Sequence, residues 1–384
     1  MTQFASRSIA MIGAAAAMVT LLAGCAGAAT PAASSSPSAP TTGSPTPTAT
    51  PAAALAPTPR FDLTCDDLLP QADLRRVLGR TVTALDAATA TSAREEFRGI
   101  AQQYIARTDG GLACGWSANG TGDGQTASLT VYPDGAARWK WFKAYYGYTT
   151  DSPHEYCADN DGTCYLTAYT NGLYVEVTLV HVTVKLGAEN SDGLRATPPA
   201  VTSVFASVLK RLDSIGTLRP AWVPPADTKT VPTAHSHLLS PAQAKKALGI
   251  SATPGLTGPD GGAPLKSDIP IFGFSITSAD SDSGYAYIRW LPAGGWAQRE
   301  LLASPSAIAK TPLDVPGLAD GDTAYVGTDS KGNRIVDLVL GGNWIELETF
   351  RITADFGVQA PRISQEKYTR TLAADIVANF AKWS

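Results

Sequence analysis

The sequence has little of the chemistry on which enzymes and metal sites usually depend. It contains 4 histidines in 384 residues, and it has no G-x-S-x-G, P-loop, H-E-x-x-H or complete S-x-x-K motif set. His235 and His237 lie two residues apart, but no third ligand follows nearby. The net charge of −4 is small for this length and disfavours a nucleic-acid partner. We therefore predict no catalytic residue, no metal ligand and no cofactor.

The first 25 residues contain one charge, Arg7, followed by an apolar run from Ile9 to Leu22. This run is shorter than the roughly 20 residues that a membrane-spanning helix needs, and it is typical of an export signal. It leads into Leu22-Ala23-Gly24-Cys25, which resembles the bacterial lipobox. The resemblance implies lipidation of Cys25 and cleavage just before it, so residues 1–24 are predicted to be a lipoprotein signal peptide. The alternative is an ordinary secretory signal with an incidental cysteine.

Residues 26–59 lack nearly everything from which a core is built. Apart from Leu55, every residue in this stretch is Ala, Gly, Ser, Thr or Pro. Such a composition predicts a disordered linker over residues 25–60, which could extend to about 100 Å in a polyproline conformation. The lipid and the linker together place the folded part outside the cell, tethered to the outer face of the cytoplasmic membrane.

Five cysteines leave one without a disulfide partner, and lipidation of Cys25 accounts for it. The other four, Cys65, Cys114, Cys157 and Cys164, allow three pairings in an exported protein. The segment "CADNDGTC" also combines two thiols with two aspartates, which raises the alternative of a metal site. Zinc sites prefer closer cysteine pairs together with a second pair or histidines, so oxidation is the better interpretation.

The remaining sequence contains an internal duplication. Four pairs of similar segments occur in the same order in two halves, which favours a tandem repeat over chance similarity. We therefore expect a first domain over 61–218, an inter-domain linker over 219–234 and a second domain over 235–384. The matched segments are 68–79 with 238–249, "CGWS" (114–117) with "FGFS" (272–275), "NGLYVEV" (171–177) with "GNWIEL" (342–347), and a helical pattern at the end of each half.

Each half combines helix signals with strand signals. Ser240 before Pro241 is a typical helix start, and Gly79 and Gly249 occupy the position of a left-handed helix stop. Runs of β-branched and aromatic residues separated by turns predict antiparallel hairpins. The predicted fold class is α+β, with two tandem related domains that each consist of an antiparallel sheet and packed helices. The predicted strands are 127–132, 173–180, 285–290, 334–340 and 344–350.

Several of these motifs together resemble a known family. Cys65, the helix "LLPQADLRRVLG" and "CGW" at 114–116 are similar to an actinobacterial lipoprotein domain family of unknown function. In the second half, "VPGLADGDTAYV" (315–326) is similar to extracytoplasmic sensor domains of mycobacterial kinases and to related lipoproteins. The resemblance implies a cell-envelope lipoprotein without established catalytic residues.

The same resemblance implies a disulfide pattern. The family pairs the cysteine before the first helix with the one that enters the strand, which corresponds to Cys65 and Cys114 and leaves Cys157 to pair with Cys164. In the second half the family's cysteine positions fall on His235 and Phe272, so no equivalent disulfide is expected there.

One segment, "ARWKWFKAYYGY" (137–148), contains six aromatic residues within ten positions. At helical spacing Trp139, Phe142 and Tyr146 share one face, while Trp141, Tyr145 and Tyr148 share another. One face is expected in the core. The second face, Trp141, Tyr145 and Tyr148, is predicted to bind an envelope protein, a glycan or a lipid. Trp and Tyr suit such partly solvated surfaces because each combines an apolar ring with a polar group. Packing of this face against the second domain is the alternative.

Three functions remain open at this point. The first is a non-catalytic binding, sensing or accessory module outside the membrane, which the tether and the duplication favour. The second is a carrier of an apolar lipid or cell-wall molecule, which requires an apolar cavity of some hundreds of Å³. The third is an enzyme with an unrecognised site, which requires a cleft with convergent groups of perturbed pKa.

Overall fold

The computed structural model describes residues 56–85, 102–119, 124–158, 162–188, 194–231, 235–257, 272–278, 281–304, 307–352 and 359–383. The predicted signal peptide, Cys25 and the linker up to residue 55 lie outside these residues. All described residues belong to one compact unit, Ala52–Ser384. Among the described helices, none has the length and apolar character needed to span a bilayer.

The first domain contains a seven-stranded antiparallel sheet. Its order is β1-β2-β3-β6-β5-β4-β7, so the hairpin of β5 and β6 pairs with β3 at the centre. Asn171 and Gly172 form the turn of that hairpin, both with positive φ, as the sequence signal "TNG" predicts. The strands are β1 (Thr83–Ala84), β2 (Leu112–Ser117), β3 (Thr126–Tyr132), β4 (His154–Ala158), β5 (Cys164–Thr170), β6 (Leu173–Val180) and β7 (Leu194–Arg195).

The second domain repeats this sheet. Its order is β11-β12-β13-β14-β10-β9-β8, which in the reverse direction matches the first sheet strand for strand. One edge strand differs in its place along the chain. β11 comes before its sheet neighbour β12, whereas the equivalent β7 comes after its sheet neighbour β4. The α+β fold with two related tandem sheets is therefore confirmed. The strands are β8 (Gly255–Thr257), β9 (Phe272–Ser278), β10 (Ser281–Leu291), β11 (Lys310–Pro312), β12 (Thr323–Thr328), β13 (Arg334–Leu340) and β14 (Asn343–Thr349).

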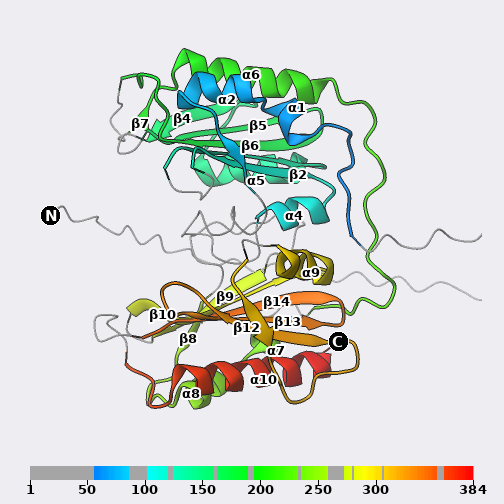
Figure 1. Ribbon diagram of the computed structural model, residues 1–384, viewed down its shortest axis with the longest axis vertical. Coiled ribbons are helices and arrows are strands. Elements are labelled where there is room, and N and C mark those ends of the chain that lie inside the picture. Colours follow the sequence, from blue (N-terminus) through cyan, green and yellow to red (C-terminus); the bar gives the residue numbers. More distant parts are fainter. Residues whose placement is uncertain are drawn as a thin grey trace, which may run out of the picture. The chain divides into compact units, whose positions relative to one another are not determined.

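Helices flank both sheets. In the first domain α1, α2 and α6 lie on one face of the sheet and α5 on the other, and in the second domain α7, α8 and α10 lie on one face and α9 on the other (Figure 1). We call the sheet face covered by α1, α2 and α6, or by α7, α8 and α10, the inner face. The opposite face of each sheet is the outer face. The helices are α1 (Cys65–Leu68), α2 (Gln71–Leu78), α4 (Gln102–Thr108), α5 (Ala136–Tyr146), α6 (Pro199–Asp213), α7 (His235–Leu238), α8 (Pro241–Leu248), α9 (Gly295–Ala303) and α10 (Gln365–Trp383).

The predicted helix boundaries are confirmed. The Ser240 side chain accepts a hydrogen bond from the Gln243 backbone, and the Gln243 side chain accepts one from the Ser240 backbone, which forms a capping box with Pro241 as the next residue. Gly79 ends α2 at φ 72° and Gly249 ends α8 at φ 64°, a conformation that side chains with a Cβ rarely adopt. Local signals of this kind fix the start of α8 and the C-terminal ends of α2 and α8.

Each inner face buries an apolar core. Leu129 and Val177 from β3 and β6 pack with Val204 and Phe205 of α6, all at or below 2 % exposure. The second core has the same plan, with residues of β10, β13 and β14 against α8 and α10. Burying a side chain of this size stabilises a fold by about 1.5–3 kcal/mol, so these two layers hold the sheets in place.

Helix α4 contacts the second domain. The buried Tyr104 ring lies edge-on to Trp296 and Trp344, with centroid distances of 5.7 and 5.9 Å. Arg107 adds an ion pair, with 2.7 Å between its Nη1 and Oε1 of Glu300. Such aromatic pairs contribute about 0.5–1.5 kcal/mol each beyond the area that they bury.

Candidate functional site

The outer face of the first sheet is polar at its centre and aromatic at its edge. Cross-strand pairing places Glu176 of β6 between Thr130 of β3 and Thr167 of β5, with His154 of β4 next in the same row. Thr130 and Thr167 are buried, while Glu176 is half-buried and accepts a hydrogen bond of 2.8 Å from the Tyr174 hydroxyl. A carboxylate therefore lies among hydroxyl groups on this face.

Helix α5 packs onto the same face. Phe142 is buried between Trp139, whose ring stacks on it at 5.4 Å, and Tyr174 of the sheet at 6.2 Å. The indole N–H of Trp139 donates to Asp151 at 3.0 Å, and Lys143 forms an ion pair with the same carboxylate. These contacts hold α5 against the outer face of the sheet.

Seven rings continue from α5 onto strands β4 and β5, and we call them the aromatic surface. Each ring contacts the next, at centroid distances of 5.2, 4.9, 6.0, 3.9, 5.2 and 5.1 Å in order. Three of the residues are exposed: Tyr145 at 46 %, Tyr146 at 50 % and Tyr165 at 39 %. The members in order are Trp141, Tyr145, Tyr146, Tyr148, His154, Tyr156 and Tyr165.

The predicted binding residues all belong to this surface, but they differ in exposure. Tyr145 is exposed, while Trp141 and Tyr148 are half-buried against an aromatic cluster that also contains second-domain residues. Tyr146 was expected to share the core face of the helix with Trp139; instead it is exposed at the last position of α5. The two predicted faces of the helix therefore merge at its C-terminal end.

Sequence reasoning missed the part of the surface that comes from the strands. His154, Tyr156 and Tyr165 lie up to 24 residues beyond Trp141, and only the pairing of β4 with β5 places Tyr156 opposite Tyr165. The alternation in "HEY" (154–156) could have indicated that His154 and Tyr156 share a face. Nothing local indicated that this face continues the aromatic surface of α5.

Burial shifts the pKa of four groups of this surface in favour of their uncharged forms. It is the main cause that raises the pKa of Tyr146 and Tyr148, and it raises the pKa of Tyr156 to about 12. Burial also lowers the pKa of the His154 imidazole. At neutral pH the surface therefore presents phenol hydroxyls and a neutral imidazole, which can donate and accept hydrogen bonds without a net charge.

An open groove runs beside the helix, with a volume of about 490 Å³. Its carboxylate, Asp151, has a pKa below the usual range because Lys143 and Trp139 donate hydrogen bonds to it. The groove is lined by Ala136, Trp139, Lys140, Lys143, Asp151 and Tyr169.

Comparison with known proteins adds no relative to these observations. No family model matches the chain, and neither a curated protein nor a solved structure matches it. The similarity to actinobacterial lipoproteins and kinase sensor domains therefore stays a prediction that rests on the motifs alone. The residues themselves must support any assignment of function.

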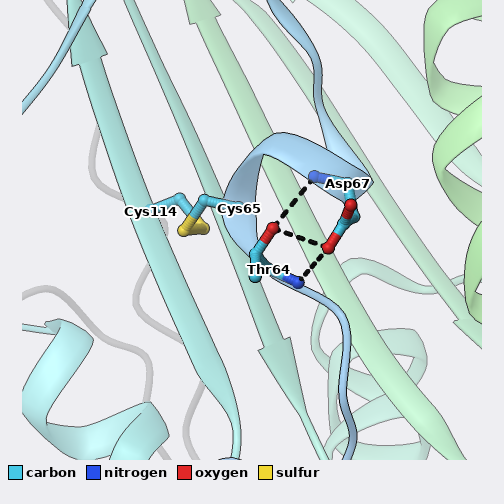
Figure 2. The surroundings of a disulfide bond; sticks show 4 residues. All are labelled: Thr64, Cys65, Asp67 and Cys114. Atoms are coloured by element: carbon cyan, nitrogen blue, oxygen red, sulfur yellow. Dashed lines mark hydrogen bonds between the residues drawn. A yellow bond between two sulfur atoms is a disulfide. The ribbon is translucent and has the colours of Figure 1, made fainter.

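Both disulfides expected from the motifs are present. Cys65 at the start of α1 bonds to Cys114 of β2 with a Cα–Cα distance of 5.8 Å, and Cys157 bonds to Cys164, its direct partner across β4 and β5. Figure 2 shows the first bond beside the capping box in which the Thr64 hydroxyl accepts from the Asp67 backbone. Among the described residues, no group of three or more His, Cys, Asp or Glu side chains is placed to hold a metal ion.

The strand pairing corrects one detail of the duplication. Tyr174 and Trp344 are each the second residue of the strand that follows the β5–β6 or β13–β14 turn, so they are equivalent. Tyr174 pairs with Tyr132 and Trp344 pairs with Leu291, which makes Tyr132 and Leu291 equivalent as well. Three residues earlier in each strand, Leu129 corresponds to Ile288. Leu129 pairs with Cys114, whereas Ile288 pairs with Phe274, so the second-domain equivalent of Cys114 is Phe274 and not the predicted Phe272. The similar letters "CGWS" and "FGFS" are thus shifted by two residues in the fold.

The equivalent outer row of the second sheet carries charges. Arg289 replaces Thr130, Asp337 replaces Thr167, and Glu346 stands where the first sheet has Glu176. Arg289 Nη1 lies 3.2 Å from Glu346 and 3.3 Å from Glu348, and Lys310 Nζ lies 2.5 Å from Asp337. The duplicated sheets therefore share a glutamate position but differ in what surrounds it.

Glu346 makes the stability of the fold depend on pH. It is 6 % exposed, and burial raises its pKa to about 7, against the attraction of Arg289 and Lys310 and with the repulsion of Asp337 and Glu348. An unfolded glutamate ionises near pH 4.5, so the folded state holds the proton more tightly between about pH 4.5 and 7.

We expect the free energy of unfolding to fall as pH rises through this range, by up to about 3 kcal/mol from this group, and to level off above it. Urea unfolding at several pH values measures the slope. Glu346→Gln should flatten it, whereas Glu366→Gln at an exposed position should not. An unchanged slope in Glu346→Gln would contradict the assignment.

Proposed function

We propose that this protein is a cell-envelope lipoprotein that acts as a non-catalytic binding module, with the aromatic surface as its ligand contact. The observation that carries the proposal is the unbroken series of seven rings, three of which belong to exposed residues. Exposed tyrosines gathered in one place are costly in water and are typical of contact surfaces. The two disulfides are consistent with an exported protein.

A carrier of an apolar molecule finds less support. That function needs an enclosed apolar space, whereas the space between each sheet and its inner helices is filled by buried side chains. The groove beside α5 is open to solvent and includes Lys140, Lys143 and Asp151 in its wall. An apolar chain in this groove would remove water from these charged groups, which is unfavourable.

The anchor is tested by replacement of its cysteine. We expect Cys25→Ser to lose the lipid, because acylation requires the thiol, and to move from the membrane fraction into the medium. Metabolic labelling with a fatty acid, followed by detergent phase partition, measures both effects. A Cys25→Ser protein that still carried label and entered the detergent phase would contradict lipidation at this residue. Matching replacement of Cys157 and Cys164 should leave the label in place.

The ligand contact is tested in intact cells that produce the protein. A photoreactive phenylalanine analogue at position 145 should form an adduct on irradiation, because Tyr145 is exposed within the proposed contact. The same analogue at position 383 serves as the matched control, since Trp383 is 55 % exposed but belongs to α10 of the second domain. Adducts from position 145 in excess of those from position 383 support the proposal. Equal yields from the two positions would refute it.

A further inference from the structure

We infer that the ligand of the aromatic surface is a polysaccharide strand of the cell envelope; this inference rests on the proposed function. A sugar ring in the pyranose form has a face of C–H groups and an edge of hydroxyl groups. A site for it therefore needs flat apolar rings beside hydrogen-bonding groups that are not strongly charged. Three features of the first domain meet this requirement.

The first feature is the set of near-parallel ring pairs. Trp141 and Tyr145 stack with an interplanar angle of 26°, and Tyr156 and Tyr165 stack at 24°. One member of each pair, Tyr145 or Tyr165, is exposed, so its partner supports it in a fixed orientation. Rigid flat rings at two places on one surface suit a ligand that repeats its own ring along a chain.

The second feature is the hydrogen-bonding chemistry between these pairs. Burial is the main cause that raises the pKa of Tyr146. Electrostatic interactions with Tyr145, Glu176, Tyr148 and Tyr165 raise it further, so the polar groups of these residues lie within electrostatic reach of its hydroxyl. A phenol hydroxyl can both donate and accept hydrogen bonds. Glu176 adds a carboxylate that accepts hydrogen bonds, as it already does from Tyr174.

The third feature is the kind of apolar group that is exposed. Within the described residues of the first domain, every large hydrophobic side chain of high exposure is a tyrosine, namely Tyr145, Tyr146 and Tyr165. A lipid tail is held by aliphatic walls in an enclosed space, which this surface does not offer. Tyrosine presents a ring face and a hydroxyl together, which matches the two sides of a sugar.

The test uses wall polysaccharide from the producing cells, treated with protease and extracted with organic solvent so that protein and lipid are removed. The full chain in detergent is mixed with this insoluble material and sedimented at several protein concentrations. We expect Tyr145→Ala and Tyr165→Ala each to weaken binding at least about tenfold, the size of effect typical of a central contact residue. Tyr145→Phe keeps the ring and should stay within about threefold of the parent, because stacking carries most of the interaction. Trp383→Ala should bind like the parent.

The outcomes separate this inference from the proposed function. If the parent does not sediment with the polysaccharide, or if Tyr145→Ala binds as well as the parent, the polysaccharide inference is wrong. Should position 145 nevertheless form adducts with a protein or a lipid in cells, the proposed function survives with a different ligand. Unfolding midpoints of all variants, measured in parallel, must match the parent, and these exposed positions are expected to meet that condition.

Discussion

Replacing Lys310 with methionine is expected to lower the free energy of unfolding by about 3–5 kcal/mol, because it leaves the buried carboxylate of Asp337 without its cation. The side chains of Lys310 and Asp337 are 4 % and 0 % exposed, and 2.5 Å separates Nζ from Oδ2. The second oxygen of Asp337 has no hydrogen-bond partner in the described part of the chain. Water cannot compensate for the lost charge at such a site.

The fold makes specific room for this ion pair. Lys310 lies on the edge strand β11 opposite Gly327 of β12, and it reaches across β12 to Asp337 of β13. A Cβ atom at Gly327 would lie 2.9 Å from Cγ of Lys310, so the missing side chain lets the lysine stem pass. The ion pair thus ties an edge strand to the centre of the second sheet.

Two variants control this experiment. Lys310→Met combined with Asp337→Leu should recover much of the lost stability, because it removes both charges. Arg370→Met breaks an exposed ion pair with Glu366 and should change stability by less than about 1 kcal/mol. Denaturant unfolding of the full chain measures all three variants. A loss below about 1 kcal/mol for Lys310→Met would contradict the burial of this pair.

Removal of the Cys65–Cys114 disulfide is expected to destabilise the protein by about 4 kcal/mol, because the bond closes a loop with a sequence separation of 49. The Cys157–Cys164 bond has a separation of 7 and should contribute about 2–3 kcal/mol in the same chain-entropy model. The long loop loses more conformational freedom in the unfolded state when its ends are joined.

The measurement compares two double variants, each with both cysteines of one bond changed to alanine. All four cysteine residues are at most partly exposed and pack in the same core, so the loss of sulfur packing is similar in the two variants. Urea midpoints in oxidising buffer then report the difference in loop closure. The chain-entropy account fails if the Cys65/Cys114 variant is no less stable than the Cys157/Cys164 variant.

The sequence was sufficient for features that depend on neighbouring residues. Ser240, Gly79 and Gly249 mark helix ends through local hydrogen bonds and backbone conformation, and both helices end where these residues predict. Helix signals, runs of β-branched and aromatic residues and the four matched segments predicted the α+β fold with related sheets. These signals act over a few residues and do not require knowledge of the packing.

Features that depend on distant residues were not predictable in this way. Asp337, Glu346 and Glu348 alternate with apolar residues, a pattern that normally indicates a solvent-exposed face. In the structure all three are buried, and Arg289 and Lys310 from two other strands form ion pairs with them. The strand half of the aromatic surface was missed for a similar reason, since it depends on where β4 and β5 pair.

The central claim is that the exposed rings of the aromatic surface contact a ligand where the protein works. Hydroxyl-radical footprinting of the full chain measures this directly, in intact producing cells and after purification in detergent. We predict that Tyr145, Tyr146 and Tyr165 are oxidised several-fold more slowly in cells than in the purified protein, while Trp383 reacts at the same relative rate in both. Equal relative rates for all four residues in the two samples would contradict the claim.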